Sequence, residues 1–320
     1  VEAIGSGEYN SGAETISGRK MSEAHREMAT ALLDSTFAQF VAGIAEGRGL
    51  DEQFVRDAID LAPVTPEELE GLGLVDGVAN FDEATAKLGE GPLIQSEEYA
   101  AVDPESVGFD PVARFALVYG SGTVVMGKGT TSPTGGLLLT SDGVSEALEE
   151  AAKDPEIRAI IFRVDSPGGS PLASDIIWRA AEHARRHGKP LIASVSNYAA
   201  SGGYYVLSGA DAVVAPAGSL VGSIGVFVMR PVIAGLLEKL DIGVESMTRG
   251  SHAGILLSSQ PLDDAGRERL LEEITALYDL FVTRVAEGRG LDAEQVHEIG
   301  RGRVWTGKQA ASNGLVDELG

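Results

Sequence analysis

The stretch "IRAIIFRVDSPGGS" at Ile157–Ser170 decides the fold. It begins as an apolar run of strand length and ends in a turn rich in proline and glycine. The next residues, "ASDIIWRAAEHARRHGK" at Ala173–Lys189, have the apolar spacing of an amphipathic helix with basic residues in its last turns. "PLIASVSN" at Pro190–Asn197 is a second apolar strand. Strand, helix and strand in this order predict a pair of parallel strands.

The residues on both sides continue this alternation. Upstream, "ARFALVYGSGTVV" at Ala113–Val125 predicts two short strands around a Gly-Ser-Gly turn, and "GVSEALEEAAKD" at Gly143–Asp154 predicts a helix. Downstream we expect a helix in "SGGYYVLSGA", strands in "DAVVAP" and "GSLVGSIGVFV", and helices over residues 231–240, 263–287 and 292–299. The whole pattern predicts an α/β fold with a largely parallel sheet.

The chain contains an internal repeat. "AEGRGLD" occurs at Ala45–Asp51 and at Ala286–Asp292, and "GLVD" occurs at Gly73–Asp76 and at Gly314–Asp317, in both cases 241 positions apart. "VEAIGSG" at the N-terminus resembles "VESMTRG" 243 positions further on. The second copy includes the strand-rich residues 115–242, for which the first copy has no equivalent. We therefore expect a tandem repeat with the first copy truncated.

This repeat predicts three parts. Residues 1–90 form the C-terminal tail of the first copy, residues 91–112 form a linker, and residues 113–320 form the complete second copy. The linker is polar and contains prolines, as is common between domains. Because the chain starts at Val1 inside the first copy, we expect it to be a processed or truncated piece.

Composition limits the classes of function. The net charge of −23 argues against a nucleic-acid-binding surface, which needs clustered Lys and Arg, and favours a soluble acidic surface. The absence of cysteine excludes disulfides, thiolate metal sites and a cysteine nucleophile. No uninterrupted apolar run reaches about 18 residues, so no membrane span is expected. His183 and His187 have a helical spacing that could bind metal, but no third ligand is evident and no metal or other cofactor is expected.

Two glycine-containing loops follow predicted parallel strands, at the sheet edge where α/β proteins form their sites. In "YAASGGYY", Ser201 stands before Gly202 and Gly203, either as the N-cap of the next helix or as a nucleophile. In "DSPGGS", Gly168 and Gly169 either form a tight turn or direct an amide at a developing oxyanion. The two loops together favour an acyl-transfer site.

These loops carry a resemblance to a known family. "VDSPGGS", "KPLIASVSNYAASGGYYVLSGADAVVAPAGSLVGSIGV" and "GRVWTGKQAASNGLVDELG" resemble the signal peptide peptidase A group (protease IV) of serine peptidase family S49, in its long tandem bacterial form. The resemblance covers the chain end to end. It implies a ClpP/crotonase-like fold and a serine–lysine dyad that cleaves remnant signal peptides.

The resemblance also assigns site residues by position. It makes Ser201 the nucleophile, places Gly168 and Gly169 beside the oxyanion with the Gly202 N–H as a second donor, and puts Ser223 near the dyad. Asp165 stands where the family more often has Asn, either as a carboxylate near the site or as a cap of the turn.

The general base is missing from its expected place. The family's lysine lies in a "G-x-Y-K-S" segment of the first copy, where this sequence has "GEYNS" with Asn10, and the matching position of the second copy is Ala253. An amide side chain cannot take the serine proton at neutral pH, which predicts a weak or inactive peptidase. Alternatively Lys20, His252 or another chain supplies the base, or Asn10 is an altered position.

The resemblance further implies peptide substrates, namely cleaved signal peptides and hydrophobic segments. It implies a homo-oligomer, expected to be a tetramer, and a location at the bacterial inner or plasma membrane with the catalytic part facing the periplasm or exterior. Membrane attachment would come from a region absent from this chain. An extended substrate could pair with the strand edge in "SIGVFV", although these residues could equally form core. A non-catalytic peptide-binding scaffold and a crotonase-type acyl-CoA enzyme remain as alternatives.

Overall fold

The computed structural model describes residues 1–14, 18, 20–87, 91, 94–109, 112–250, 252–255 and 257–320. Parts of the predicted linker, residues 92–93 and 110–111, lie outside the described residues. Contacts divide the chain into two compact units, which we call unit 1 (Val1–Ser35 with Arg114–Gly320) and unit 2 (Thr36–Ala113). The N-terminal residues therefore belong to the same unit as the complete second copy of the repeat.

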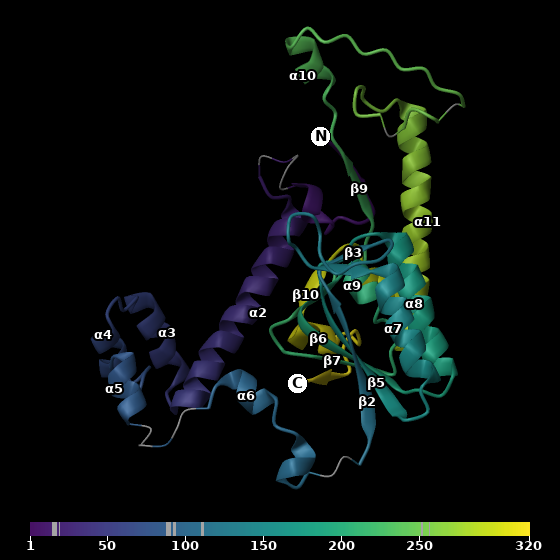
Figure 1. Cartoon of the computed structure of the whole chain (residues 1–320). Helices are drawn as coiled ribbons and strands as arrows, with labels where there is room; N and C mark the ends of the chain where they lie inside the picture. Colours follow the sequence, from purple (N-terminus) through teal and green to yellow (C-terminus); the bar gives the residue numbers. More distant parts are fainter. Residues whose placement is uncertain are drawn as a thin grey trace. The chain divides into compact units, whose positions relative to one another are not determined.

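The strands are β1 Glu2–Gly5, β2 Arg114–Ser121, β3 Thr123–Val125, β4 Leu138–Thr140, β5 Ile157–Ser166, β6 Leu191–Ala200, β7 Ala212–Ala215, β8 Leu220–Gly222, β9 Phe227–Arg230, β10 Val304–Thr306 and β11 Glu318–Leu319. The helices are η1 Ser11–Ala13, α2 Glu23–Arg48, α3 Glu52–Leu61, α4 Pro66–Gly71, α5 Phe81–Ala86, α6 Ser96–Ala100, η2 Pro104–Val107, α7 Ser141–Lys153, α8 Pro171–Arg186, α9 Gly202–Tyr205, α10 Ala234–Lys239, α11 Asp264–Arg289, α12 Ala293–Ile299 and α13 Gly307–Ser312. The predicted α/β fold is confirmed (Figure 1).

A seven-stranded sheet forms the core of unit 1 in the order β10-β8-β6-β5-β2, with β7 and β11 attached beside β6. All of its pairs are parallel except β10 with β8. The first half of β6 pairs with β7 and its last residues pair with β8. Figure 1 shows α7, α8 and α11 on one side of this sheet. Their apolar faces bury Leu148, Ile177 and Ile274 completely.

The register between β5 and β6 shifts near the carboxyl ends of the two strands. Val164 pairs with Val195 but Ser166 pairs with Ala199, so β6 carries extra residues at this point. The Asp165 carboxylate holds this irregular segment, since it accepts hydrogen bonds from the Asn197 side chain at 2.9 Å and from the Tyr198 N–H at 3.1 Å. Both of these hydrogen bonds are to β6 and not to its own turn, so Asp165 stabilises the irregular segment of β6 rather than capping the turn as expected.

The internal repeat is visible in the helices and in an ion pair. Helices α2 and α11 begin at residues 23 and 264 and end at 48 and 289, which is the 241-residue offset found in the sequence. Helices α4 and α13 keep the same offset. Arg48 pairs with Asp76 in unit 2, and the equivalent Arg289 pairs with Asp317 in unit 1. The two copies therefore share the same helical tail.

An apolar groove of about 470 Å³ lies within unit 2. Its lining includes Ile44, Leu69 and Leu74. The equivalent positions of the second copy, Val285, Ala310 and Leu315, are fully buried in the core of unit 1. The groove is thus the face that packs on the sheet in the complete copy.

Of the described helices, α2 is long and apolar enough to cross a membrane by length and composition alone. No uninterrupted apolar run marks this helix in the sequence, because polar residues such as Asp34 divide it. Its counterpart α11 is a core helix with Ile274, Phe281 and Val285 buried. In α2 only 17% of the apolar window is buried, so the burial of α11 does not carry over to its counterpart.

Candidate active site

Ser201 occupies a sharp turn between β6 and α9. Its backbone angles are φ 52° and ψ −125°, a region that residues with a Cβ rarely adopt. The Ser201 N–H donates to the Gly222 carbonyl at 2.8 Å, and the Ser201 carbonyl accepts from the N–H groups of Tyr204 and Tyr205. These bonds hold the serine in a strand–turn–helix elbow of the kind that raises a nucleophile above a sheet.

The Ser201 side chain does not cap the helix. It stands at the N-cap position of α9, yet its hydroxyl makes no capping hydrogen bond. The N-cap interpretation therefore loses its physical basis, and the hydroxyl is left for another role. The helix itself is shorter than predicted: it covers only Gly202–Tyr205, and residues 206–210 continue as turns.

The "SPGG" loop lies directly against this elbow. A Cβ on Gly168, whose φ is +102°, would lie 2.7 Å from the Ser201 Cβ and 2.8 Å from the Gly202 nitrogen. A Cβ on Gly202 would lie 3.2 Å from the Gly169 nitrogen and 2.5 Å from the Ser174 Oγ. Glycine is required at both positions because the two loops meet without room for side chains.

Two amide groups beside Ser201 have no partner. Among the residues that the structure describes, the N–H groups of Gly169 and Gly202 donate no hydrogen bond. Gly169 is exposed. Its two neighbours bond to Val124 instead: the Val124 N–H donates to the Gly168 carbonyl, and the Ser170 N–H donates to the Val124 carbonyl. The Gly168 N–H is used differently, since it donates to the Ser166 Oγ at 3.2 Å. Gly169 and Gly202 thus offer free donors near the serine, and among the described residues the Gly203 N–H likewise donates no hydrogen bond.

Two buried serines support the "SPGG" loop and were not singled out from the sequence. The Ser174 Oγ donates to the Ser170 carbonyl at 2.9 Å, and the Ser166 Oγ accepts from Gly168. The Ser170 side chain caps α8 by accepting from the Ala173 N–H. Of these serines only Ser170 could have been found from the sequence, because a serine just before a proline such as Pro171 is typical of a helix start.

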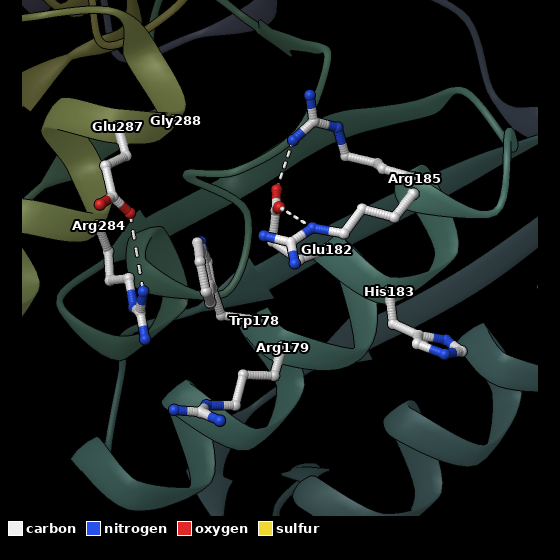
Figure 2. A pocket seen from close by; sticks show the side chains of 9 residues that line it. Trp178, Arg179, Glu182, His183, Arg185, Arg284, Glu287 and Gly288 are labelled. Carbon is white, nitrogen blue, oxygen red and sulfur yellow. Dashed lines mark hydrogen bonds and ion pairs between the residues drawn. The ribbon is translucent and has the colours of Figure 1, made fainter.

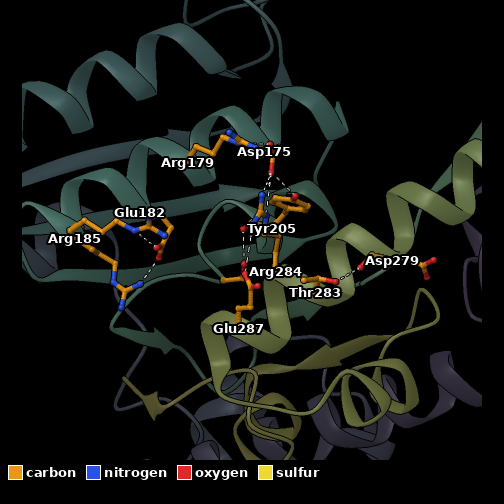
Figure 3. Close-up of polar contacts among 11 residues, drawn as sticks. Asp175, Arg179, Glu182, Arg185, Tyr205, Asp279, Thr283, Arg284 and Glu287 are labelled. Atoms are coloured by element: carbon orange, nitrogen blue, oxygen red, sulfur yellow. Dashed lines mark hydrogen bonds and ion pairs between the residues drawn. The ribbon is translucent and has the colours of Figure 1, made fainter.

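The two tyrosines of helix α9 attach it to other parts of unit 1 through their hydroxyl groups. The Tyr204 hydroxyl donates to the Leu315 carbonyl at 2.7 Å, and the Tyr205 hydroxyl donates to the Asp175 carboxylate at 2.9 Å. Burial raises the pKa of both phenols, so both stay neutral donors. Figure 3 shows Asp175 in contact with Tyr205, Arg179 and Arg284. The Asp175 carboxylate forms ion pairs with Arg179 Nε at 2.9 Å and with Arg284 Nη2 at 3.3 Å. This network fixes the helix whose first turn faces Ser201.

The matching base position lies in the N-terminal segment of unit 1. Asn10 is half-buried, and its Nδ2 donates to the Ser6 carbonyl at 3.4 Å. A Cβ on Gly225 would lie 3.2 Å from that Nδ2, so Asn10 packs beside the turn that follows β8. Ser223 in this turn has φ 51° and donates its N–H to the Arg303 carbonyl at 2.8 Å.

The other candidate bases are solvent-exposed. Lys20 and His252 are both exposed, and His252 lines a small cavity before α11 together with Asp263. Among the described residues, no hydrogen bond or ion pair joins Ser201 to Asn10, Lys20 or His252. The remaining histidines are engaged elsewhere: His25 pairs with Glu14, His183 stacks on His187 at 4.1 Å, and His297 contacts Tyr278.

The strand edge expected to hold substrate is partly core. In "SIGVFV", Ile224 and Val226 are buried, while Phe227 is 43% exposed. Phe227 begins β9, which pairs antiparallel with β1 through Gly5 opposite Phe227. One edge of β9 is thus occupied by the N-terminal strand of the chain.

A further cavity, of about 630 Å³, lies between α8 and α11 (Figure 2). Trp178 lies at its centre with the Arg284 guanidinium 4.0 Å from the ring centroid. Its four lining arginines, Arg179, Arg185, Arg186 and Arg284, each form an ion pair with a carboxylate. The cavity is therefore a charge-paired groove rather than a preformed anion site.

The chain matches known proteins over most of its length. The model of Peptidase family S49 matches residues 1–93 and 183–320. The chloroplastic serine protease SPPA of Arabidopsis thaliana is 32% identical over 325 residues, which cover 98% of this chain and 48% of that protein. Protease 4 of Haemophilus influenzae is 30% identical over 332 residues, which cover 98% of this chain and 53% of that protein. The chain thus spans about half the length of these relatives.

Among solved structures, a ClpP1 mutant from Listeria monocytogenes aligns with 63% of this chain and 90% of its own, at 15% identity and a TM-score of 0.39. A likeness of this size adds nothing to the account of the site.

Proposed function

Because the chain belongs to peptidase family S49, we propose that it is a serine endopeptidase of the signal peptide peptidase type with Ser201 as its nucleophile. Membership of the family supports a serine-type peptidase, and the identity of the nucleophile is our assignment. The observation that carries it is the strained, uncapped Ser201 beside two amide groups without partners. Strained backbone of this kind clusters at active sites.

In the proposed reaction the Ser201 Oγ attacks the carbonyl carbon of the scissile peptide bond. The carbonyl oxygen becomes an oxyanion, which accepts hydrogen bonds from the N–H groups of Gly169 and Gly202. Removal of one such donor typically costs about 10²–10³ in kcat. Gly168 lines this side of the site by allowing the close approach to Ser201 rather than by donating. Ser223 would orient the base from the turn that follows β8. It is the next residue after Gly222, whose carbonyl accepts the Ser201 N–H.

The serine proton needs an acceptor, and we propose that residue 10 is the place for it. In this family the base is a lysine kept neutral by burial, and Asn10 cannot replace it because an amide is not basic at neutral pH. We therefore expect the sequence as it stands to turn over slowly or not at all. A lysine at position 10 would restore the acceptor.

For substrates we propose peptides of hydrophobic character such as cleaved signal peptides. For assembly we propose a homo-oligomer, a tetramer by family resemblance. For location we propose the bacterial inner or plasma membrane, with the catalytic unit facing the periplasm or exterior. The exposed Phe227 and Met229 of β9 support an apolar contact near the site.

The test is covalent labelling of Ser201 together with restoration of the base. A fluorophosphonate probe should label Ser201, and the label should be absent in Ser201→Ala. The variant Asn10→Lys should raise turnover of a leader-peptide substrate, whereas the matched variant Asn10→Met, of similar length but without a proton acceptor, should not. If Asn10→Lys behaves like Asn10→Met, the assignment of position 10 is wrong.

A non-catalytic peptide-binding protein is the second candidate, and Asn10 is the observation that favours it. It predicts that the unchanged sequence binds a leader peptide but leaves it intact. Turnover by the unchanged sequence that disappears in Ser201→Ala would exclude this candidate.

A further inference from the structure

Three segments far apart in the sequence meet beside the proposed base position. They are the turn at residues 7–10 (the base turn), the turn at residues 222–225 (the elbow turn) and the loop at residues 300–303 (the bracket loop). The elbow turn holds Ser201 directly, because the Gly222 carbonyl accepts the Ser201 N–H at 2.8 Å. The question is what holds the base turn against it.

The bracket loop bonds to both turns through its backbone. On one side, the Tyr9 N–H donates to the Arg301 carbonyl at 3.1 Å. On the other, the Gly302 N–H donates to the Ile224 carbonyl at 2.8 Å, and the Ser223 N–H donates to the Arg303 carbonyl at 2.8 Å. Consecutive residues of the bracket loop therefore connect the base turn to the elbow turn.

The three segments touch where they carry glycine. A Cβ on Gly302, whose φ is +81°, would lie 2.7 Å from the nitrogen, Cα and Cβ of Asn10. A Cβ on Gly7 would lie 2.3 Å from the Arg301 carbonyl oxygen, and a Cβ on Gly225 would lie 2.9 Å from the Gly302 Cα. Real Cβ atoms do not tolerate such distances, so any side chain here must push the segments apart.

The Arg303 side chain of the bracket loop stacks on an aromatic ring of the base turn. The Arg303 guanidinium lies 4.7 Å from the centroid of the Tyr9 ring and 4.4 Å from that of the Trp305 ring. Its Nη1 donates to Glu27 at 2.8 Å, and the Tyr9 hydroxyl donates to the same carboxylate at 3.1 Å. Tyr9, the residue before position 10, is thus held by a backbone hydrogen bond to Arg301 and by the stacking of its ring on Arg303.

We propose that the bracket loop, through Gly302, positions residue 10 relative to Ser201, so that a C-terminal loop of the second copy sets the geometry of a base carried by the first. Gly302 and Arg303 are positioning residues and do not touch substrate. The inference rests on the proposed function, because residue 10 matters for catalysis only if it carries the base. The placement of residue 10 can nevertheless be measured without catalysis.

The first experiment uses the absence of cysteine from the sequence. In the full chain, Asn10→Cys introduces a single thiol, and its rate of alkylation by iodoacetamide reports how tightly residue 10 is held. Adding Gly302→Ala should raise this rate at least 10-fold. The matched control is Gly188→Ala, since Gly188 has the same φ of +81° but no neighbour within 4 Å of its Cβ, and it should leave the rate within 2-fold.

An unchanged alkylation rate in Gly302→Ala, or an equal rise in Gly188→Ala, would overturn the proposal. If Gly302→Ala does not fold, Arg303→Lys replaces it: this variant keeps the charge but loses the planar stack on Tyr9. It should raise the rate about 3-fold or more, and no rise in this variant would equally overturn the proposal.

The second experiment measures catalysis in the Asn10→Lys background. Gly302→Ala should lower kcat about 100-fold with KM within 3-fold, since displacement by about 1 Å can cost this much. Because a displaced lysine becomes more hydrated, its pKa should rise and the midpoint of the pH–rate profile should move upward. A merely destabilising change, such as Gly188→Ala, should leave that midpoint in place, and a fixed midpoint in Gly302→Ala would contradict the proposal.

The two failures are distinguishable. An inert Asn10→Lys variant would reject the proposed function, while the thiol at position 10 would still decide whether Gly302 holds that residue.

Discussion

Replacing Ser201 by glycine should stabilise unit 1 while removing the hydroxyl. At φ 52° and ψ −125° a residue with a Cβ is strained by about 1–3 kcal/mol, and glycine relieves this strain. Glycine in turn costs about 0.5–1 kcal/mol through the greater freedom of the unfolded chain. No capping bond of the hydroxyl is lost. The net expectation is a gain of about 1 kcal/mol in the free energy of unfolding.

The assay is denaturant unfolding followed by tryptophan fluorescence, because Trp178 and Trp305, the two tryptophans of the chain, both lie in unit 1. A gain of about 1 kcal/mol corresponds to a rise in Tm of roughly 2–4 °C for a domain of 150–250 residues. Ser201→Ala keeps the strain and should unfold close to the unchanged protein. Ala200→Gly, at the end of β6, should lose about 0.5–1 kcal/mol because glycine relieves no strain there.

The comparison between the two variants at position 201 decides the reasoning. If Ser201→Gly is no more stable than Ser201→Ala, the backbone at this position stores no strain. The argument from the elbow to a nucleophile would then lose its physical support.

Three further predictions concern the residues around the site. The hydrogen bond from Arg303, with a second from a tyrosine, lowers the pKa of Glu27 in the folded protein. The stabilisation that the Glu27 carboxylate contributes is therefore present above its ordinary pKa of 4.5 and is lost as pH falls through the lower folded value. Glu27→Gln should be less stable than the unchanged protein at pH 7 and equally stable near pH 2, and a deficit that persists at pH 2 would contradict this. Arg289→Leu should cost about 1–3 kcal/mol because this guanidinium is only 4% exposed, whereas Arg48→Leu at the equivalent exposed pair should cost less than about 1 kcal/mol, and equal costs would be inconsistent with the burial. Asp175→Ala should lower the free energy of unfolding by about 1–3 kcal/mol, because it leaves the buried Tyr205 phenol without its acceptor and removes one of the two carboxylates paired with Arg284. A neutral effect in the same unfolding assay would show that the network in Figure 3 is dispensable.

The sequence predicted the order of strands and helices in unit 1 because that order depends on local patterns. The apolar run at Ile157–Ser166 and the amphipathic spacing after it lie in β5 and α8, as expected. The 241-residue offset of the repeat recurs in the bounds of α2 and α11. Helix α9 was predicted too long, because "VLSGA" after Tyr205 is apolar enough for a helix but is tied into turns, such as the Ala210 N–H to the Leu207 carbonyl.

The candidate site was predictable only in part. Ser201 and the two glycine loops follow from the rule that sites form at the carboxyl ends of parallel strands. The approach of Gly302 to Asn10 could not be predicted, because it joins residues nearly a whole chain apart and shows no periodicity. The Asp175–Tyr205 bond is equally invisible in the sequence, since each residue alone fits an ordinary helix.

The most direct measurement is a crystal structure of the protein after reaction with a phosphonate inhibitor. The phosphorus should be bonded to the Ser201 Oγ, with one phosphonyl oxygen about 2.7–3.1 Å from the nitrogens of both Gly169 and Gly202. A phosphonyl group on another residue, or one whose oxygens point away from both amides, would contradict the account.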